Sequence, residues 1–303
     1  MVWLAVILVV CSAVLHASWN LFGKKVSPTP AFFLLAFLCS TAVLTPIALP
    51  LFMPVVMHNS GFTLLLWSAI LIAGIAQMVY CNGLAYAYAA GDMSQAYPLA
   101  RAAPVLFVVI FSFWWGIETL DSWIAIVGIG LLIVGCFILP MRHLKDFRWV
   151  NYLNRTSAYA LMAALGTTVY TFADKAALTE LAQLYPELSG FEVALFYIWL
   201  EGVSACVFMG LYVALKPIET QQLKSLAHTS LKWAVITGLA VNATYVLVLW
   251  AMQMTDNVSL IVALRQLSIP IGAILGIWVF REPAGVTRWL GIFLITLGVM
   301  LAL

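Results

Sequence analysis

The sequence predicts an all-α integral membrane protein whose ten transmembrane helices form two inverted five-helix repeats. Three observations lead to this prediction: the composition, ten long apolar segments, and a duplicated pattern of charges. Hydrophobic residues make up 64% of the 303 residues, charged residues only 9%, and the mean hydropathy is +1.05. A soluble domain of average composition has about 25% charged residues. We therefore expect almost the whole chain to lie within a membrane.

Ten mostly apolar segments follow one another along the chain, each close to the roughly 20 residues that a helix needs to cross a bilayer. The first five are expected at 2–22, 31–53, 62–86, 94–115 and 122–140. The last five are expected at 157–178, 191–214, 231–253, 258–279 and 287–303. They divide the chain into a first repeat at 1–140, a connecting loop at 141–156 and a second repeat at 157–303.

Three charged residues recur at the same spacing in both halves, which indicates an internal duplication. Separations of 9 and then 17 residues connect Asp92, Arg101 and Glu118, and again Asp256, Arg265 and Glu282. Each set is followed by two glycines seven residues apart, Gly128 with Gly135 and Gly291 with Gly298. Because five spans is an odd number, the second repeat enters the membrane from the opposite side. Inverted repeats of this kind are common in secondary transporters.

The lysines and arginines predict the orientation, because they accumulate in cytoplasmic loops. All those in predicted loops follow odd-numbered spans: Lys24, Lys25, Arg142, Lys145, Arg148, Arg155, Lys216, Lys224, Lys232, Arg281 and Arg288. The sequence therefore predicts a multi-pass protein of the inner (plasma) membrane with cytoplasmic odd loops and both termini outside.

Several classes of function are not expected. The five cysteines fall within predicted spans, where we expect packing thiols rather than disulfides. The sequence has no P-loop, no metal-ligand spacing and no serine nucleophile motif, so we expect no enzyme, cofactor or metal site. The net charge of +2 comes with basic loops and indicates no nucleic-acid partner. The expected partners are a small-molecule substrate and the lipid bilayer; a proton as coupling ion and a homodimer remain open.

Short motifs resemble a known family. The run from Ser94 to Arg101, with Glu118 and the following glycine pair, resembles the end of an EamA-type repeat. The stretch from His16 to Asn20 and the stretch from Tyr170 to Lys175 resemble the first helix of such repeats. Over about 2–140 and 157–303, the chain thus resembles the drug/metabolite transporter superfamily. The resemblance implies ten helices and transport of small organic molecules, often the export of amino acids, metabolites or toxic compounds.

One departure from the family pattern concerns proton exchange. The four-helix multidrug exporters of this superfamily exchange protons for cationic drugs at a glutamate in their first helix. Spaced from Lys24, that position is His16 here, and in the second half it is Gly166. Neither residue is a carboxylate, so the resemblance does not extend to exchange of that type.

Charged residues inside the spans are the first candidate site residues, because an ionisable group at membrane depth is costly and usually functional. Glu201 lies near the middle of span seven and is a proton-coupling site, a counter-ion for a substrate amine, or a structural carboxylate. Arg101 and Arg265 lie about two turns inside spans four and nine, where the inversion predicts one towards each face. They either attract a carboxylate or act as gating charges, or else they cap backbone carbonyls or pair with a loop acid such as Glu118 or Glu282. Asp174 shares a helix face with Tyr170 and either lines the pathway or occupies a solvated helix end.

Uncharged candidates complete the predicted site. His16 shares a face of span one with Asn20 and either relays protons or donates a structural hydrogen bond. The other candidates are polar or aromatic residues well inside spans, which together predict an aromatic-lined central cavity: Trp19, Tyr80, Tyr97, Asn242 and Tyr245. Pro98 and Pro104 flank Arg101, and Pro270 follows Arg265, so we expect broken helices at matching places in both halves.

These features predict a secondary transporter that exports small polar or zwitterionic metabolites, such as amino acids or amines, by alternating access. The alternative is a proton-coupled exporter of hydrophobic cationic compounds. An alternative of another class is a non-transporting membrane scaffold.

Overall fold

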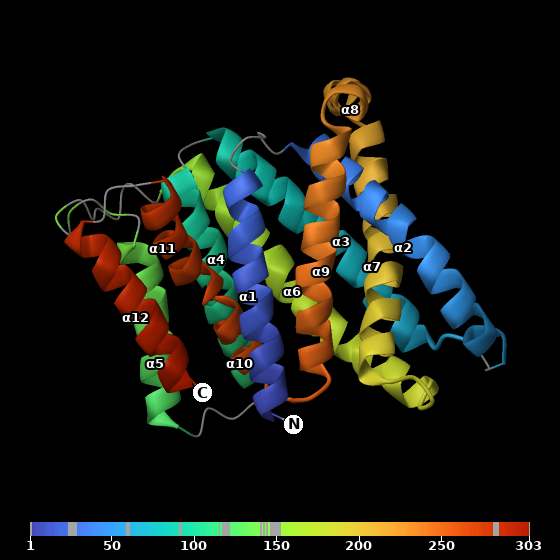
Figure 1. The fold of residues 1–303 in the computed structure, drawn as a ribbon, viewed down its shortest axis with the longest axis horizontal. Coiled ribbons are helices and arrows are strands. Elements are labelled where there is room, and N and C mark those ends of the chain that lie inside the picture. Colours follow the sequence, from blue (N-terminus) through green and yellow to red (C-terminus); the bar gives the residue numbers. More distant parts are fainter. Residues whose placement is uncertain are drawn as a thin grey trace.

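The computed structural model describes residues 2–23, 29–58, 61–90, 93–114, 116, 122–139, 141, 143, 145, 153–280 and 285–302. These residues fold into helices without strands (Figure 1). The first half contains α1 (Val2–Gly23), α2 (Pro30–His58), α3 (Leu64–Ala90), α4 (Met93–Trp114) and α5 (Trp123–Ile138). The second half contains α6 (Arg155–Leu184), α7 (Gly190–Ala214), α8 (Pro217–Thr229), α9 (Leu231–Met252), α10 (Val258–Arg265), α11 (Ser268–Phe280) and α12 (Val286–Ala302).

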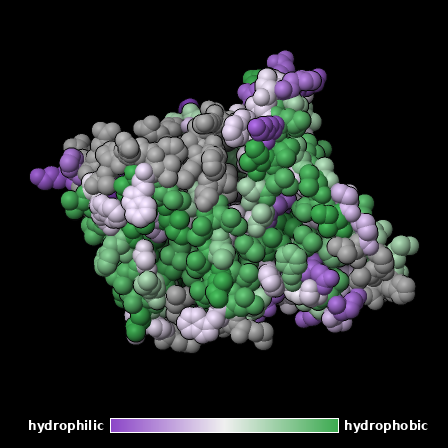
Figure 2. All heavy atoms as spheres, viewed as in Figure 1, coloured by the Kyte–Doolittle hydropathy of each residue, from purple (hydrophilic) through white to green (hydrophobic). Residues whose placement is uncertain are grey.

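Five helical stretches of the described chain are long and apolar enough to cross a membrane, which supports a multi-pass membrane protein. They are Pro30–Pro50, Leu64–Ala90, Gly190–Ala214, Leu231–Met252 and Val258–Trp278. Large apolar side chains on several helices point outward, among them Ile7, Ile72 and Phe293. Figure 2 shows hydrophobic atoms across the middle of the visible face and hydrophilic atoms around α8, at the lower right and at the left edge. An apolar surface of this extent indicates contact with lipid.

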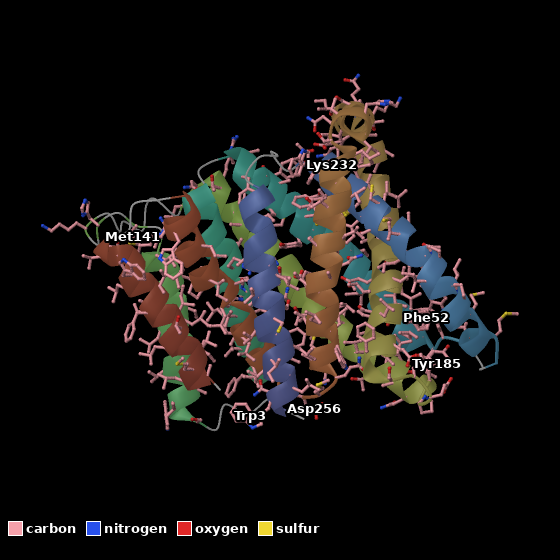
Figure 3. The ribbon with its side chains drawn as sticks, viewed as in Figure 1. Trp3, Phe52, Met141, Tyr185, Lys232 and Asp256 are labelled. Carbon is pink, nitrogen blue, oxygen red and sulfur yellow. The ribbon has the colours of Figure 1, made fainter. Side chains whose placement is uncertain are left out.

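Both termini lie at one end of the bundle, and α8 lies at the other end (Figure 1). Figure 3 shows the same separation in side chains, with Lys232 near α8 and with Trp3 and Asp256 at the end that holds the termini. The basic segment after α7 is therefore remote from the termini. Which side of the membrane each end faces stays a prediction.

Helix α6 is central to the bundle, because it packs along α3 and α4 and also touches α7, α9 and α10. Its buried face carries polar residues, including Thr167, Thr171 and Asp174. The helix continues to Leu184, six residues beyond the predicted end of span six. The alternative of a solvated helix end for Asp174 is therefore wrong, since this side chain is 0% exposed and lies inside a continuous helix.

The repeated glycines bring α5 and α12 into backbone contact. A Cβ atom on Gly128 would lie 2.7 Å from the carbonyl oxygen of Gly298, and one on Gly135 would lie 3.0 Å from that of Gly291. No larger residue allows so close an approach, which is why small residues are enriched where transmembrane helices meet. The duplicated glycine pattern thus joins the last helices of the two halves.

Helix α8 was not among the predicted elements. It begins with Pro217, a residue favoured in the first turn of a helix because its missing N–H is not needed there. Glu219 is buried and fixes α8 to α2, since its Oε2 accepts a hydrogen bond from the backbone N–H of Ala31 at 3.1 Å. The carboxylate therefore caps the start of α2.

The predicted span 258–279 is two helices, because α10 ends at Arg265 and α11 begins at Ser268. Pro270 has no N–H to donate to the carbonyl of Gln266, which instead accepts from the Ile269 N–H at 2.9 Å. Helix α4 is continuous through both of its prolines, so the prediction of breaks in both halves is correct only for the second. The residue 164 positions before Pro270 is Leu106, which keeps its N–H.

Candidate functional site

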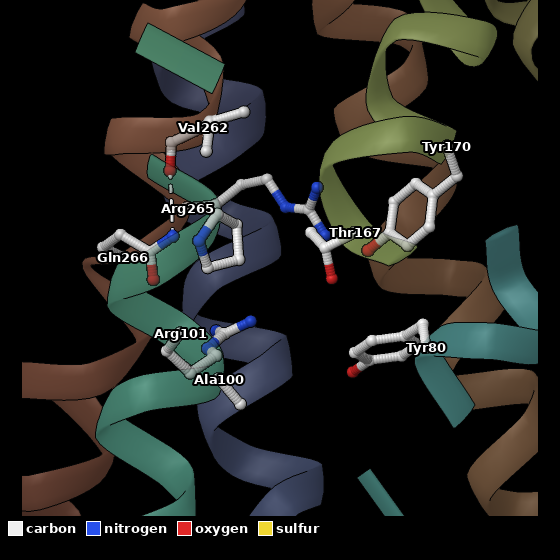
Figure 4. Close-up of a pocket in the computed structure, with 9 residues that line it drawn as sticks. Tyr80, Ala100, Arg101, Thr167, Tyr170, Val262, Arg265 and Gln266 are labelled. Carbon is white, nitrogen blue, oxygen red and sulfur yellow. Dashed lines mark hydrogen bonds between the residues drawn. The ribbon is translucent and has the colours of Figure 1, made fainter. Parts of the chain in front are cut away.

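A small cavity lies where α3, α4, α6 and the broken helix α10–α11 meet (Figure 4). It is lined by Tyr80, Ala100, Arg101, Pro104, Thr167, Tyr170, Val262, Arg265 and Gln266. Its volume is about 20 Å³, which is enough for an ordered water molecule and too little for an organic metabolite. A substrate would therefore bind here only after the surrounding helices move apart.

Two guanidinium groups reach this cavity, from Arg101 on α4 and from Arg265 at the end of α10. The two arginines occupy the same place in the duplicated charge pattern, 164 residues apart. Both line one cavity rather than lying one towards each face as predicted. Arg101 is about 12 Å along the 22-residue helix α4, so its long side chain can reach the middle of the bundle.

Neighbouring polar and aromatic groups hold the arginines in place. Arg101 Nη2 donates a hydrogen bond to Ser268 Oγ, which in turn donates to the backbone oxygen of Arg265 at 2.9 Å. The guanidinium carbon of Arg265 lies 5.1 Å from the ring centroid of Tyr245, a cation–π contact, and its side chain hydrogen-bonds Tyr170. Within the described residues, no salt bridge joins Arg265 to a carboxylate. The guanidinium of Arg265 is therefore held by tyrosines within the cavity lining.

Three tyrosines from α3, α6 and α9 pack edge to face beside the arginines. The ring of Tyr170 lies 5.9 Å from that of Tyr80 at 82°, and 5.8 Å from that of Tyr245 at 85°. This geometry is the favourable one for aromatic pairs. All three are predicted site residues, and the structure brings them together.

Two buried carboxyl groups interact with residues of the site but do not line the cavity. Asp174 accepts hydrogen bonds from the hydroxyl of Tyr197 at 2.7 Å and from the hydroxyl of Tyr245. Glu201 is 3% exposed, and its Oε1 has no hydrogen-bond partner among the described residues. Glu201 lies within electrostatic reach of Asp174 and Arg265. The carboxyls and the cavity arginine therefore form one electrostatic group.

The remaining predicted residues have different outcomes. His16 is half-buried on α1, within electrostatic reach of both Arg101 and Arg265. Asn242 is half-buried on α9, and in the described part of the chain no hydrogen bond connects it to the tyrosines. The side chains of some candidates lie outside the described part: Trp19, Asn20 and Tyr97. The same is true of three charges of the duplicated pattern: Asp92, Glu118 and Glu282.

The structure adds residues that the sequence analysis missed. Tyr197 precedes Glu201 by four residues, so the shared helix face was a signal that it belongs with the buried carboxyls. Gln266 follows Arg265 directly and Ser268 comes three residues after it, at the helix break that proline predicts. Thr167 precedes Tyr170 by three residues and lines the cavity with it. The predictions favoured charged residues and overlooked these neutral neighbours.

Comparisons with known proteins inform the fold and not the substrate. No family profile and no curated protein sequence matches the chain. Solved structures do match, with 27 chains similar to this one. One of them, described as "Crystal structure of protein", has a TM-score of 0.67 and 17% sequence identity. The match covers 97% of this chain and 95% of that chain, so the fold is shared over nearly the whole length.

Proposed function

We propose that this chain is a secondary transporter of the drug/metabolite transporter type, which exports small polar or zwitterionic metabolites by alternating access. In this proposal ten spans form two inverted five-helix repeats in the inner membrane, with both termini outside. Support comes from the helices found at all ten apolar segments and from the position of both termini at one end of the bundle. The glycine contact between α5 and α12 also fits a pair of related halves.

The observation that carries the proposal is the convergence of Arg101 and Arg265 on one small cavity beside a broken helix. Each half contributes one guanidinium group from an equivalent position. Guanidinium groups bind carboxylates through two parallel hydrogen bonds, and broken helices surround the substrate in many transporters. A substrate with a carboxylate fits the arginines, and its apolar part fits the tyrosine rings.

The alternative of a hydrophobic-cation exporter receives less support. Such a site needs a carboxylate in contact with the substrate, whereas both charged residues that line this cavity are arginines. Asp174 and Glu201 are buried and do not line the cavity, so they suit proton coupling better than direct binding of a drug cation. A membrane scaffold requires neither a broken helix nor buried charges of both signs.

Currents across a supported membrane test the proposal directly. Proteoliposomes would be exposed to amino acids and small amines, and separately to quaternary ammonium compounds, at pH 6 and pH 8. We expect responses to the amino acids that disappear in Arg265→Gln. The matched control is Arg155→Gln, which makes the same change at an exposed arginine on the first turn of α6.

Responses confined to quaternary ammonium compounds would overturn the proposal in favour of the cation exporter. Electroneutral exchange produces no current. If no current is recorded with any compound, a second assay would measure the exchange of isotope-labelled amino acids across the membrane of the same liposomes. If that assay also shows no exchange, the proposal of amino-acid transport is wrong.

A further inference from the structure

Gln266 occupies the short break between α10 and α11, where its side chain lines the cavity and is only 3% exposed. Its Nε2 donates a hydrogen bond to the backbone oxygen of Val262 at 3.2 Å (Figure 4). Its Oε1 has no hydrogen-bond partner among the described residues. A buried amide oxygen without a partner costs free energy, so such a group requires an explanation.

The end of α10 fixes which way this amide points. The backbone N–H of Gln266 donates to the oxygen of Ala263 at 3.0 Å, which tightens the last turn of the helix. The carbonyl of Val262 accepts instead from the side chain of Gln266. Only the NH₂ end of an amide can donate to a carbonyl, so the oxygen end must face away from Val262. The helix break thus leaves an acceptor without a partner on a residue of the cavity lining, turned away from Val262.

This acceptor complements the two arginines. A guanidinium group only donates hydrogen bonds, so Arg101 and Arg265 offer donors and positive charge to a ligand. Gln266 Oε1 offers the opposite, an acceptor that must receive an N–H or O–H. A cavity with this lining fits a ligand that carries an anionic group and a hydrogen-bond donor close to each other.

We propose that Gln266 is a specificity-determining residue, whose Oε1 accepts a hydrogen bond from a donor next to the carboxylate that the arginines bind. The ligand class is therefore a 2-amino acid or a 2-hydroxy acid rather than a simple carboxylic acid. This inference rests on the proposed function, because it concerns the substrate of the same cavity. The inference goes beyond the proposed function because it names the protein group that discriminates against carboxylic acids lacking a neighbouring hydrogen-bond donor.

The physical basis of the selectivity is the cost of leaving Oε1 without a partner. A ligand with an ammonium or hydroxyl group pairs with it, whereas an analogue without the donor leaves it buried and unsatisfied. Sites built to bind a substrate N–H or O–H therefore reject analogues that lack it far more strongly than a missing methylene would be rejected. We expect discrimination of roughly 10- to 100-fold in affinity.

The test uses two series of probes that differ only in the donor: L-alanine, L-lactate and propanoate, and L-phenylalanine, L-phenyllactate and 3-phenylpropanoate. Each competes with labelled L-alanine or L-phenylalanine for purified full-length protein in lipid nanodiscs. The variant is Gln266→Leu. The matched control is Gln77→Leu on α3, because Gln77 is also buried with an Oε1 that lacks a partner in the described residues, and it does not line the cavity.

Wild type and Gln77→Leu should prefer the donor-bearing probes, and Gln266→Leu should bind all members of a series alike. The relative affinity of the amino and hydroxy acids then shows which donor is preferred. If Gln266→Leu keeps the preference, the inference is wrong, while the proposed function stands provided that binding still requires Arg265. If wild type binds no probe, the inference and the proposed substrate class both fail. Unfolding temperatures of the variants confirm that the protein is folded in each comparison.

Discussion

Tyr245 donates a hydrogen bond to Asp174 from 71 residues further along the chain, and the face of its ring carries the guanidinium of Arg265 at 5.1 Å. One tyrosine thus connects a buried carboxyl group to the cavity. Through this connection, binding of a ligand at the arginine could change the environment of the carboxyl group. Removing the tyrosine hydroxyl, a single-atom change, tests how much the hydrogen bond contributes.

Tyr245→Phe should lower the free energy of unfolding by about 1–3 kcal/mol, because it removes a hydrogen bond to a buried carboxyl group. Tyr197→Phe should cost a similar amount, since Tyr197 donates to the other oxygen of Asp174 at 2.7 Å. Thermal and denaturant unfolding of the purified variants measures both effects. The matched control is Tyr185→Phe, which removes a buried hydroxyl that has no partner in the described structure. This control should be neutral or stabilising; an equal loss in all three variants would contradict the role of Asp174.

Glu201→Gln should abolish transport driven by a pH gradient and leave the protein folded. Glutamine has nearly the same shape as glutamic acid but cannot bind and release a proton. Uptake or release of labelled substrate in proteoliposomes under an imposed pH gradient measures the effect. Wild-type rates in this variant would exclude Glu201 as the coupling residue. Asp174→Asn would then test the second carboxyl, which lies within electrostatic reach of the first.

Gly128→Ala should destabilise the protein by about 1–3 kcal/mol, the usual cost of overpacking a close contact. The new methyl group would lie 2.7 Å from the backbone oxygen of Gly298, and a backbone atom cannot rotate away as a side chain can. Gly130→Ala is the matched control on the same helix, because a Cβ there meets no atom within 4 Å. Unfolding of both variants side by side provides the measurement. Equal stability would show that α5 and α12 can separate without cost.

Glu219→Ala should loosen the first turn of α2 at a cost of about 1 kcal/mol, because that turn loses a carboxylate that caps its N–H groups. The amide of Ala31, which donates to Glu219 at 3.1 Å, should exchange its hydrogen for deuterium faster than in wild type. The control is Glu187→Ala, an exposed glutamate in the turn after α6. Unchanged exchange at Ala31 would mean that α8 is held to α2 by its apolar contacts alone.

The sequence predicted the positions of helices well, because apolar runs of membrane length leave few alternatives to a helix. It also singled out Tyr80, Tyr170 and Tyr245 as site residues, but it did not predict that they pack beside the arginines or that one cavity collects both guanidinium groups. The helix between 217 and 229 was missed because its composition is that of a polar loop. Gln266 was missed for a different reason. The role of a side-chain amide depends on its hydrogen-bond partner, and the partner of Gln266 is the backbone carbonyl of Val262, which the structure alone reveals.

The polar central helix has a consequence for how this protein is made. Asp174 and Lys175 lie next to each other inside α6. A charged residue at the centre of a helix adds about 2.5–3.5 kcal/mol to the cost of leaving the translocon for lipid, and this cost applies to Asp174 more than to Lys175, whose amine reaches Asp256 at the end of the bundle (Figure 3). Helix α3, its main packing partner, is apolar and emerges from the ribosome much earlier. We therefore expect α6 to enter the bilayer against helices that are already there, so that the first half of the chain acts as the docking surface for the second during synthesis.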